Sequence, residues 1–286
     1  MKKIRLMSAA LMVLLTTSCD RLDIQGMFWS HGDRTEARVD QWLQWNADNG
    51  EPVISGVADN YKIYVCSDVH LTDSAPRLAQ MLSAEGSDPD AIFSIVNGDI
   101  ANESGEVPFR VADSVIRMAA DPCYVTLGNH DIYFDCQEHF ARYFHTSTYT
   151  ITVNTVGGHK DLWVMTDSGN ATMGKRQTEW LRALLKRRGE YRNVVVCTHT
   201  CLFRTSYNYS TTPAANLPEE EQYALQDMMS KNHVDLFVMG HFHHKEQQVI
   251  GGVKYVMTDN LNEDKDAPSY LVVSCGNDVD YEYVEL

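Results

Sequence analysis

Five short apolar runs in this chain each end at a cluster of aspartate, asparagine or histidine residues. Apolar runs of this length, rich in β-branched residues, predict buried strands. The runs and the clusters that follow them are Tyr61–Cys66 before Ser67–His70, Ala91–Val96 before Asn97–Asp99, Cys123–Leu127 before Gly128–Asp131, Val194–Cys197 before Thr198–Thr200, and Val234–Met239 before Gly240–His244. Ligands of open α/β sheets bind at the carboxyl ends of the strands. We therefore expect the five clusters to meet in one crevice.

Helical patterns alternate with these strands. Strand and helix in alternation predict a layered α/β fold. The expected helices are Ala75–Ala84, Phe109–Ala119, Cys136–Phe144, Lys175–Arg187 and Glu219–Lys231, and the further expected strands are Thr148–Val153, Leu162–Thr166, Gln247–Ile250, Val253–Met257, Tyr270–Val273 and Tyr281–Val284. Gly251 and Gly252 predict a hairpin turn between two of these strands. A separate helical pattern, Glu36–Trp45, is expected to pack against the main domain.

The residue types in the clusters are ligands of divalent metals. Carboxylate, imidazole and amide oxygen bind ions of the Mn, Fe and Zn group. Asp68, Asp99 and Asn129 lie about 30 residues apart along the chain, which is about the length of one strand–helix–strand unit. Neighbouring parallel strands would thus bring the three side chains together.

Short spacings within the clusters support the same interpretation. Asp68 and His70 are two residues apart, as are His241 and His243. On an extended segment, residues with this spacing face the same side. Glycines are expected to allow the sharp turns before the ligands, because glycine tolerates unusual backbone angles; these are Gly98, Gly128 and Gly240.

Each cluster alone is a weak signal. An Asp-x-His or Gly-Asp pair is common, an isolated Gly-Asn-His-Asp fits a polar turn, and His199 alone fits a hydrogen-bonded core histidine. The histidines after Gly240 alone fit a nonspecific histidine tract. All five clusters together, each closing a predicted strand, favour a metal site over these alternatives.

The clusters resemble the calcineurin-like metallophosphoesterase superfamily, whose pattern is DxH, GDxx(D/N), GNH(D/E), a later H, and GHxH. The matching segments are Asp68-Val69-His70, Gly98-Asp99-Ile100-Ala101-Asn102, Gly128-Asn129-His130-Asp131, His199, and Gly240-His241-Phe242-His243. The resemblance spans about residues 61–245. It implies an α/β fold in four layers, with a β-sandwich of two mixed sheets flanked by helices.

The resemblance also implies the role of each residue. One metal ion would be held by Asp68, His70, Asp99 and His243, and the other by Asp99, Asn129, His199 and His241. Asp99 would bridge the two ions together with a hydroxide. His130 would contact the phosphate or protonate the leaving group, Asp131 would orient the His130 ring, and Asn102 would support the ligands without binding metal.

The implied activity is hydrolysis of a phosphate mono- or diester by the metal-bridging hydroxide, with two divalent ions of Mn, Fe or Zn. Asn102 stands where purple acid phosphatases carry a tyrosine ligand, so that subclass is disfavoured. Two alternatives stay open: hydrolysis of the pyrophosphate bond of a nucleotide-diphosphate conjugate, and a non-catalytic lipoprotein that binds metal or ligand. The side chains that follow the fourth motif either line the leaving-group side or belong to a solvated loop; they are Phe203, Arg204, Tyr207 and Tyr209.

The N-terminus resembles a bacterial lipoprotein signal. A basic start is followed by the apolar segment Leu6–Leu15, which is too short to span a bilayer, and small residues precede Cys19. We expect lipidation at Cys19 and export to a membrane-anchored, periplasmic or cell-surface location; an ordinary signal peptide cut nearby is the alternative. The predicted domains are the signal (1–19), a linker and helix (20–60), and the metallophosphoesterase domain (61–286).

The charge and the cysteines narrow the function further. A net charge of −15 disfavours nucleic acid as a partner but allows a phosphoester substrate, because bound metals reverse the local sign. No Cys-x-x-Cys pair occurs, which argues against a thiolate zinc site. Three cysteines lie in or beside apolar runs and are expected in the core (Cys66, Cys123 and Cys197), and three are left undecided between free thiol and disulfide (Cys136, Cys201 and Cys275).

Overall fold

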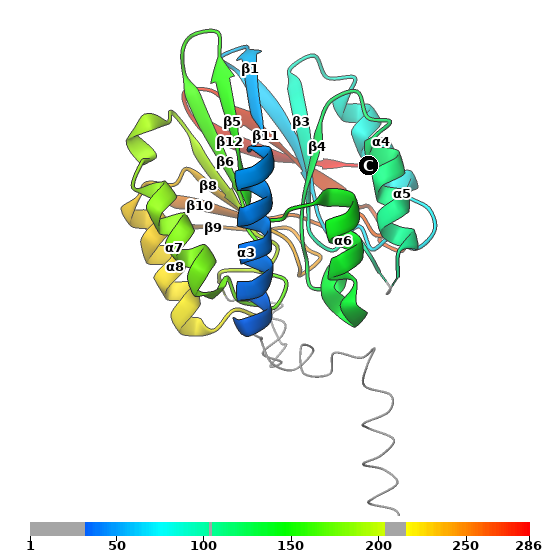
Figure 1. The fold of residues 1–286 in the computed structure, drawn as a ribbon. Helices are drawn as coiled ribbons and strands as arrows, with labels where there is room; N and C mark the ends of the chain where they lie inside the picture. Colours follow the sequence, from blue (N-terminus) through cyan, green and yellow to red (C-terminus); the bar gives the residue numbers. More distant parts are fainter. Residues whose placement is uncertain (1–31, 103–104, 204–215) are drawn as a thin grey trace, which may run out of the picture.

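Two mixed β-sheets form the centre of the protein (Figure 1). The computed structural model describes residues 32–102, 105–203 and 216–286. The seven-stranded sheet has the order β1-β5-β6-β7-β8-β10-β9 and the five-stranded sheet the order β12-β11-β2-β3-β4. The strands are β1 (Val53–Val57), β2 (Tyr61–Cys66), β3 (Ala91–Asn97), β4 (Cys123–Thr126), β5 (Tyr149–Thr155), β6 (Lys160–Met165), β7 (Val194–Cys197), β8 (Leu236–Met239), β9 (Glu246–Ile250), β10 (Val253–Met257), β11 (Ser269–Cys275) and β12 (Val279–Glu285).

The two sheets pack face to face over an apolar core to which both contribute. Phe93 of β3 and Trp163 of β6 are fully buried there, with ring centroids 5.5 Å apart. β2, β3 and β4 are parallel, as are β6, β7 and β8. Strands buried on both faces need apolar residues throughout, which is why their sequences are continuous apolar runs.

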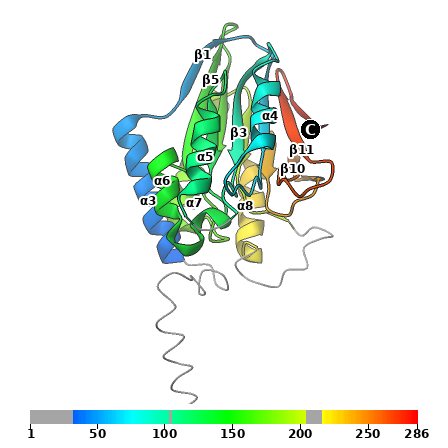
Figure 2. The ribbon, with the colours of Figure 1, turned by 90° about the vertical axis from the view of Figure 1, so that its right-hand side faces the viewer.

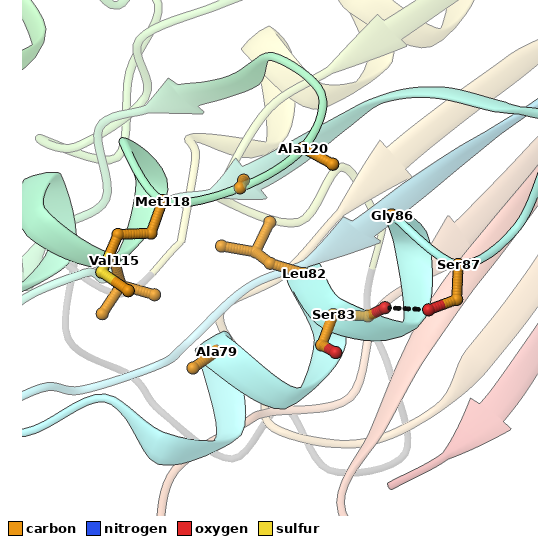
Figure 3. A pocket seen from close by; sticks show the side chains of 9 residues that line it. Ala79, Leu82, Ser83, Gly86, Ser87, Val115, Met118 and Ala120 are labelled. Carbon is orange, nitrogen blue, oxygen red and sulfur yellow. Dashed lines mark hydrogen bonds between the residues drawn. The ribbon is translucent and has the colours of Figure 1, made fainter.

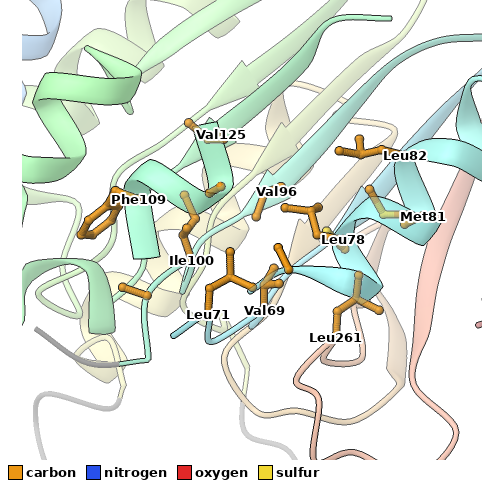
Figure 4. Close-up of a cluster of buried hydrophobic side chains, with 14 of the residues drawn as sticks. Val69, Leu71, Leu78, Met81, Leu82, Val96, Ile100, Phe109, Val125 and Leu261 are labelled. Atoms are coloured by element: carbon orange, nitrogen blue, oxygen red, sulfur yellow. The ribbon is translucent and has the colours of Figure 1, made fainter. Parts of the chain in front are cut away.

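Helices cover the outer faces of both sheets, as Figures 1 and 2 show. The five-stranded sheet is covered by α4 (Pro76–Glu85), α5 (Val107–Ile116) and α6 (Gln137–Phe144), and the seven-stranded sheet by α7 (Gly174–Leu185) and α8 (Glu219–Lys231). Figure 4 shows Leu78 of α4 beside the strand side chain Val96, with Phe109 of α5 on the other side of the same cluster. The four-layered α/β sandwich confirms the predicted fold class.

The helix α3 (Gly32–Asn49) precedes the first strand and runs beside α7 (Figure 1). Its Trp42 is only 1% exposed, and the carboxylate of Glu36 accepts the backbone N–H of Arg176 at 3.0 Å. Glu36 therefore satisfies an unpaired donor in the first turn of α7. The predicted packing of this helix against the main domain is observed.

Most predicted elements occur within a few residues of their predicted bounds, but β1 was missed. β1 pairs in parallel with β5 at the edge of the seven-stranded sheet. Its run is short and contains Gly56, and Val53 is 62% exposed, so it carries little of the apolar signal of a buried strand. The predicted hairpin at Gly251 and Gly252 joins the antiparallel β9 and β10.

The predictions on the N-terminal signal and on the cysteines can be compared with the structure only within the described residues. The signal peptide and Cys19 lie outside the described residues. Within the three described ranges, no helix is both long and apolar enough to cross a membrane. No disulfide joins any of the six described cysteines, which include the undecided Cys136, Cys201 and Cys275.

A small cavity lies between α4 and α5 (Figure 3). Leu82, Val115 and Met118 contribute apolar side chains to its wall, which Gly86 and Ala120 also line. None of the predicted metal ligands lines it. The predicted metal site is therefore separate from this cavity.

Candidate metal centre

The structure brings the predicted ligands together at the carboxyl ends of five strands. Two groups have ligand atoms within 4.8 Å of one another: Asp68, His70, Asp99 and His243 form one, and Asp99, His199 and His241 form the other. Asp99 is common to both groups. The side chains follow β2, β3, β7 and β8, and Asn129 follows β4.

The first group surrounds Asp68. The Nε2 atoms of His70 and His243 lie 3.0 Å apart. Asp68 Oδ1 is 3.2 Å from His243 Nε2 and 3.9 Å from His70 Nε2. The other carboxylate oxygen, Oδ2, accepts the hydroxyl of Ser67 and the amide of His241. One oxygen of Asp68 is thus held by the protein while the other faces the two imidazoles.

The second group surrounds His199, which is fully buried. Its Nε2 lies 3.2 Å from Asp99 Oδ2 and 3.2 Å from Asn129 Oδ1. Its Nδ1 lies 2.9 Å from the carbonyl oxygen of Asn97. When Nδ1–H donates to that carbonyl, Nε2 is left with a lone pair directed at the cluster, an arrangement usual for metal-binding histidine.

The remaining members are oriented by nearby groups. The amide nitrogen of Asn129 donates to the hydroxyl of Tyr133 at 2.8 Å, which turns Asn129 Oδ1 toward His199. The ring of His241 lies edge-on to that of His199, with centroids 5.2 Å apart. Sequence analysis gave no role to Asn97, Tyr133 or Ser67, because hydroxyl and carbonyl partners of ligands follow no spacing rule.

The backbone is left-handed at most of these positions. Asp68, His70, Asp99, His241 and His243 have φ of 53°, 49°, 54°, 80° and 58°. Non-glycine residues adopt this region at a cost of about 1–3 kcal/mol each and are concentrated at functional sites. The expectation that Asp68 and His70 share the face of an extended segment was wrong, because tight turns rather than strand geometry direct them into one site.

The three glycines of the motifs have different roles. Gly98 has φ 87°, as expected for a sharp turn. Gly128 and Gly240 have ordinary φ, so the predicted backbone role does not apply to them. A Cβ at Gly128 would overlap the Asp99 amide nitrogen and Oδ1, and a Cβ at Gly240 would lie 2.5 Å from Ser67 Oγ. These two glycines allow close approach of loops to the aspartates.

Opposite charges set the ionisation of the cluster. Burial opposes the charged form, but His199 and His243 lower the pKa of Asp68 to about 2. Burial likewise opposes ionisation of Asp99, yet His199 lowers the pKa of Asp99 well below its ordinary value. Burial lowers the pKa of His199, but Asp99 and Asp68 outweigh it and raise this pKa to about 10. The aspartates are therefore ionised, and a metal must displace a proton from His199.

The donor set fits two divalent cations. Asp68 Oδ1 is buried and, among the described residues, accepts no hydrogen bond. The Nε2 atoms of His70 and His243 lie 3.0 Å apart, so when both rings carry their proton on Nδ1 they present two lone pairs to one ion. Carboxylate, imidazole and amide oxygen together are the ligands of Mn, Fe and Zn.

His130 lies beside the first group but is not part of either. Its ring centroid is 4.5 Å from that of His70, and its Nδ1 is 3.3 Å from the carbonyl oxygen of Asn102. Its backbone N–H donates to Asp99 Oδ1 at 2.8 Å. The His130 ring thus contacts the main-chain carbonyl of Asn102, and not the Asn102 side chain.

The predicted role of Asp131 is not what the contacts show. The Asp131 carboxylate is fully buried and accepts the amides of Ala101 and Gly128, each at 2.9 Å, instead of contacting the His130 ring. Burial and the charge of Asp99 raise the pKa of Asp131 to about 6. Asp131 thus joins the loops that follow β3 and β4, because unpaired backbone donors at strand ends require an acceptor.

The predicted substrate wall is only partly described. Phe203 is 5% exposed and packs against Tyr255 in the core beneath α8, so it does not line an open pocket. Arg204, Tyr207 and Tyr209 lie outside the described residues. His244, which follows the last motif, pairs with Glu246 at 3.1 Å.

Solved structures share this fold. A dimetal phosphatase from Danio rerio aligns with TM-score 0.61 and 10% identity over 79% of this chain and 98% of its own. The anchor GAP50 of the inner membrane complex of Plasmodium aligns with TM-score 0.56 and 12% identity over 79% and 84%. A purple acid phosphatase from yellow lupin aligns with TM-score 0.59 and 12% identity over 81% of this chain and 52% of its own. No curated protein sequence matches the chain significantly.

The two-sheet α/β sandwich, with His/Asp groups at its strand ends, defines a metal-dependent phosphoesterase. The chain belongs to the calcineurin-like phosphoesterase family, whose sequence profile matches residues 61–245. The resemblance predicted from the motifs is thereby confirmed.

Proposed function

We propose that this protein hydrolyses a phosphate mono- or diester with two divalent metal ions. The observation that carries the proposal is the sharing of Asp99 by two groups of ligand atoms, each within 4.8 Å. Asp68, His70, Asp99 and His243 would hold one ion. Asp99, Asn129, His199 and His241 would hold the other.

When bound, two such ions neutralise a phosphate ester, orient it and supply an activated nucleophile near neutral pH. The protein's own residues prepare the site for this. Asp68 is fixed by Ser67 and the His241 amide, and His199 by the Asn97 carbonyl. Such supporting contacts orient the ligand atoms and would strengthen metal binding.

His130 is proposed to move the proton. Its position beside His70, outside both ligand groups, leaves its Nε2 free of metal in this assignment. With Nδ1–H donating to the Asn102 carbonyl, a protonated ring donates from Nε2 to the departing alkoxide oxygen. The anion that leaves is thereby released as an alcohol.

The test is turnover on a panel of substrates. p-Nitrophenyl phosphate reports monoesterase activity, bis(p-nitrophenyl) phosphate diesterase activity, and a nucleotide-diphosphate conjugate pyrophosphatase activity. Turnover of an ester that is lost on chelation and restored by Mn²⁺ or Zn²⁺ would support the proposal. Turnover of the diphosphate conjugate alone would favour pyrophosphate hydrolysis over ester hydrolysis. Metal binding without turnover of any substrate would favour a non-catalytic binding protein.

We further propose that the protein is exported and anchored through a lipid on Cys19. The support is the sequence alone: a basic start, a short apolar segment and small residues before that cysteine. Metabolic labelling with a radioactive fatty acid should mark the wild type and not Cys19→Ser. Equal labelling of the two, or none in either, would refute lipidation at this residue.

A further inference from the structure

The helix α3 is joined to a turn that follows β6. We call this segment, Thr166–Asn170, the β6 turn. Arg38 Nε and Nη2 donate to the two carboxylate oxygens of Asp167 at 2.8 and 3.0 Å, and Trp42 Nε1 donates to Asp167 Oδ2 at 3.0 Å. Arg38 Nη1 also donates to Asn170 Oδ1 at 2.6 Å. The groups are buried, so the ion pair is shielded from water and tightly oriented.

The same turn holds the loop that carries His199. Ser168 Oγ accepts the backbone N–H of Thr200 at 2.9 Å, and the Ser168 carbonyl accepts the Thr200 hydroxyl at 3.0 Å. On the other side of His199, the carbonyl of Cys197 accepts the amide of Thr166 at 3.0 Å. The β6 turn therefore bonds to the chain on both sides of His199.

The turn also supports the loop that carries Asn129. Gly169 approaches that loop so closely that a Cβ there would overlap Leu127 Cδ2 and lie 2.9 Å from the Gly128 carbonyl oxygen. Asn129 Oδ1 in turn lies 3.2 Å from His199 Nε2. One turn thus contacts two of the loops that supply the second group of ligands.

The first group is held by other segments. Ser67, which bonds to Asp68, contacts Thr258 Oγ1 at 2.6 Å. The carbonyl of His243 accepts the ammonium of Lys265 at 3.0 Å, and Lys265 pairs with Asp259 at 3.0 Å. These contacts come from the segment that follows β10 and not from α3.

From these contacts we infer that Arg38 of α3 is a positioning residue for one half of the metal centre, acting through Asp167 and Ser168 on His199 and Asn129. This inference rests on the proposed function. Groups that orient metal ligands from behind typically change metal affinity by about 10–100-fold when removed. Disturbing the Arg38–Asp167 pair is therefore expected to weaken binding of one ion and leave the other in place.

The experiment titrates the full chain with Co²⁺, whose visible absorption reports its coordination. Arg38→Lys keeps the charge but loses the two-pronged contact with Asp167. Ser168→Ala removes the acceptor for Thr200 without burying a charge, so it covers the case in which Arg38→Lys fails to fold. Asp40→Ala is the matched control, because it breaks the exposed 3.0 Å pair between α3 and Arg176 of α7, which does not touch the β6 turn.

The expected result is one Co²⁺ bound about tenfold or more weakly in Arg38→Lys and Ser168→Ala, with the other ion unaffected. The control should bind both as the wild type does. Wild-type affinity for both ions in the two folded variants, or equal weakening of both, would overturn the inference. A wild type that binds fewer than two ions would instead contradict the proposed function.

Amide hydrogen exchange, measured on protein freed of metal by a chelator, tests the positioning role of Arg38 independently of metal binding. Arg38→Lys should accelerate exchange across residues 197–202 relative to the wild type and to Asp40→Ala. Unchanged exchange there would overturn the positioning role whatever the metal titration shows.

Discussion

Gly128 lies so close to Asp99 that a Cβ at Gly128 would overlap both the amide nitrogen and Oδ1 of Asp99. Asp99 is the residue that both ligand groups share. The absence of a side chain at Gly128 therefore leaves the room that the shared carboxylate occupies.

Gly128→Ala should displace Asp99 and weaken metal binding by about tenfold or more. The backbone at Gly128 is not left-handed, so the effect would come from the overlap. Metal content after dialysis measures it. Gly189→Ala is the control, since a Cβ at Gly189 meets nothing within 4 Å; equal metal retention by the two variants would argue against the close contact.

His130→Ala should lower turnover by roughly 10²–10⁴-fold while both metals stay bound. The reason is that His130 touches His70 and Asn102 but belongs to neither ligand group. Steady-state kinetics and elemental analysis on one preparation check both parts. Full activity with bound metal would remove His130 from the chemistry.

Asp131→Asn should reduce stability by about 1–3 kcal/mol, because an amide offers one oxygen to the two backbone N–H groups that the carboxylate now accepts. Denaturant unfolding measures the loss. The pH profile of turnover should keep the wild-type shape, since the His130 ring contacts Asn102 instead. A pH profile of turnover shifted in the same way as that of a His130 variant would show that Asp131 does orient the His130 ring.

The stability of the protein is expected to depend on pH through Glu85, which lies outside the metal centre. It is fully buried, and neither carboxylate oxygen has a hydrogen-bond partner among the described residues. Burial, and then the charge of Asp121, raise the pKa of Glu85 from 4.5 to about 7. Between these values the folded protein keeps a proton that the unfolded chain has released, so stability falls as pH rises.

The Glu85→Gln variant should lose that part of the pH dependence, roughly 1–3 kcal/mol between about pH 4.5 and 7. Chemical unfolding of chelated protein at several pH values measures it. Glu179→Gln, at a half-exposed position of α7, serves as the control. Parallel pH curves for wild type and Glu85→Gln would show that the Glu85 carboxyl does not cause the fall.

The sequence predicted the fold because its buried strands are continuous apolar runs and its helices have one apolar face. It placed the ligands together because the carboxyl ends of parallel strands share one edge. It missed β1, whose exposed Val53 and Gly56 weaken the pattern.

The local geometry of the site was less predictable. Left-handed turns at Asp68 and His70, and the contact of Asp131 with two backbone amides, arise from loops folding against each other. The ion pair of Arg38 with Asp167 joins positions 129 residues apart. Neither spacing nor periodicity in the sequence encodes such contacts.

The most direct test of the account is the metal content of the purified protein, compared with that of Asp99→Asn. The account predicts close to two divalent ions per chain in the wild type. It predicts a marked loss of both ions in Asp99→Asn, because Asp99 belongs to both ligand groups. A wild type without bound metal, or an Asp99→Asn variant that keeps two ions, would contradict the shared metal centre.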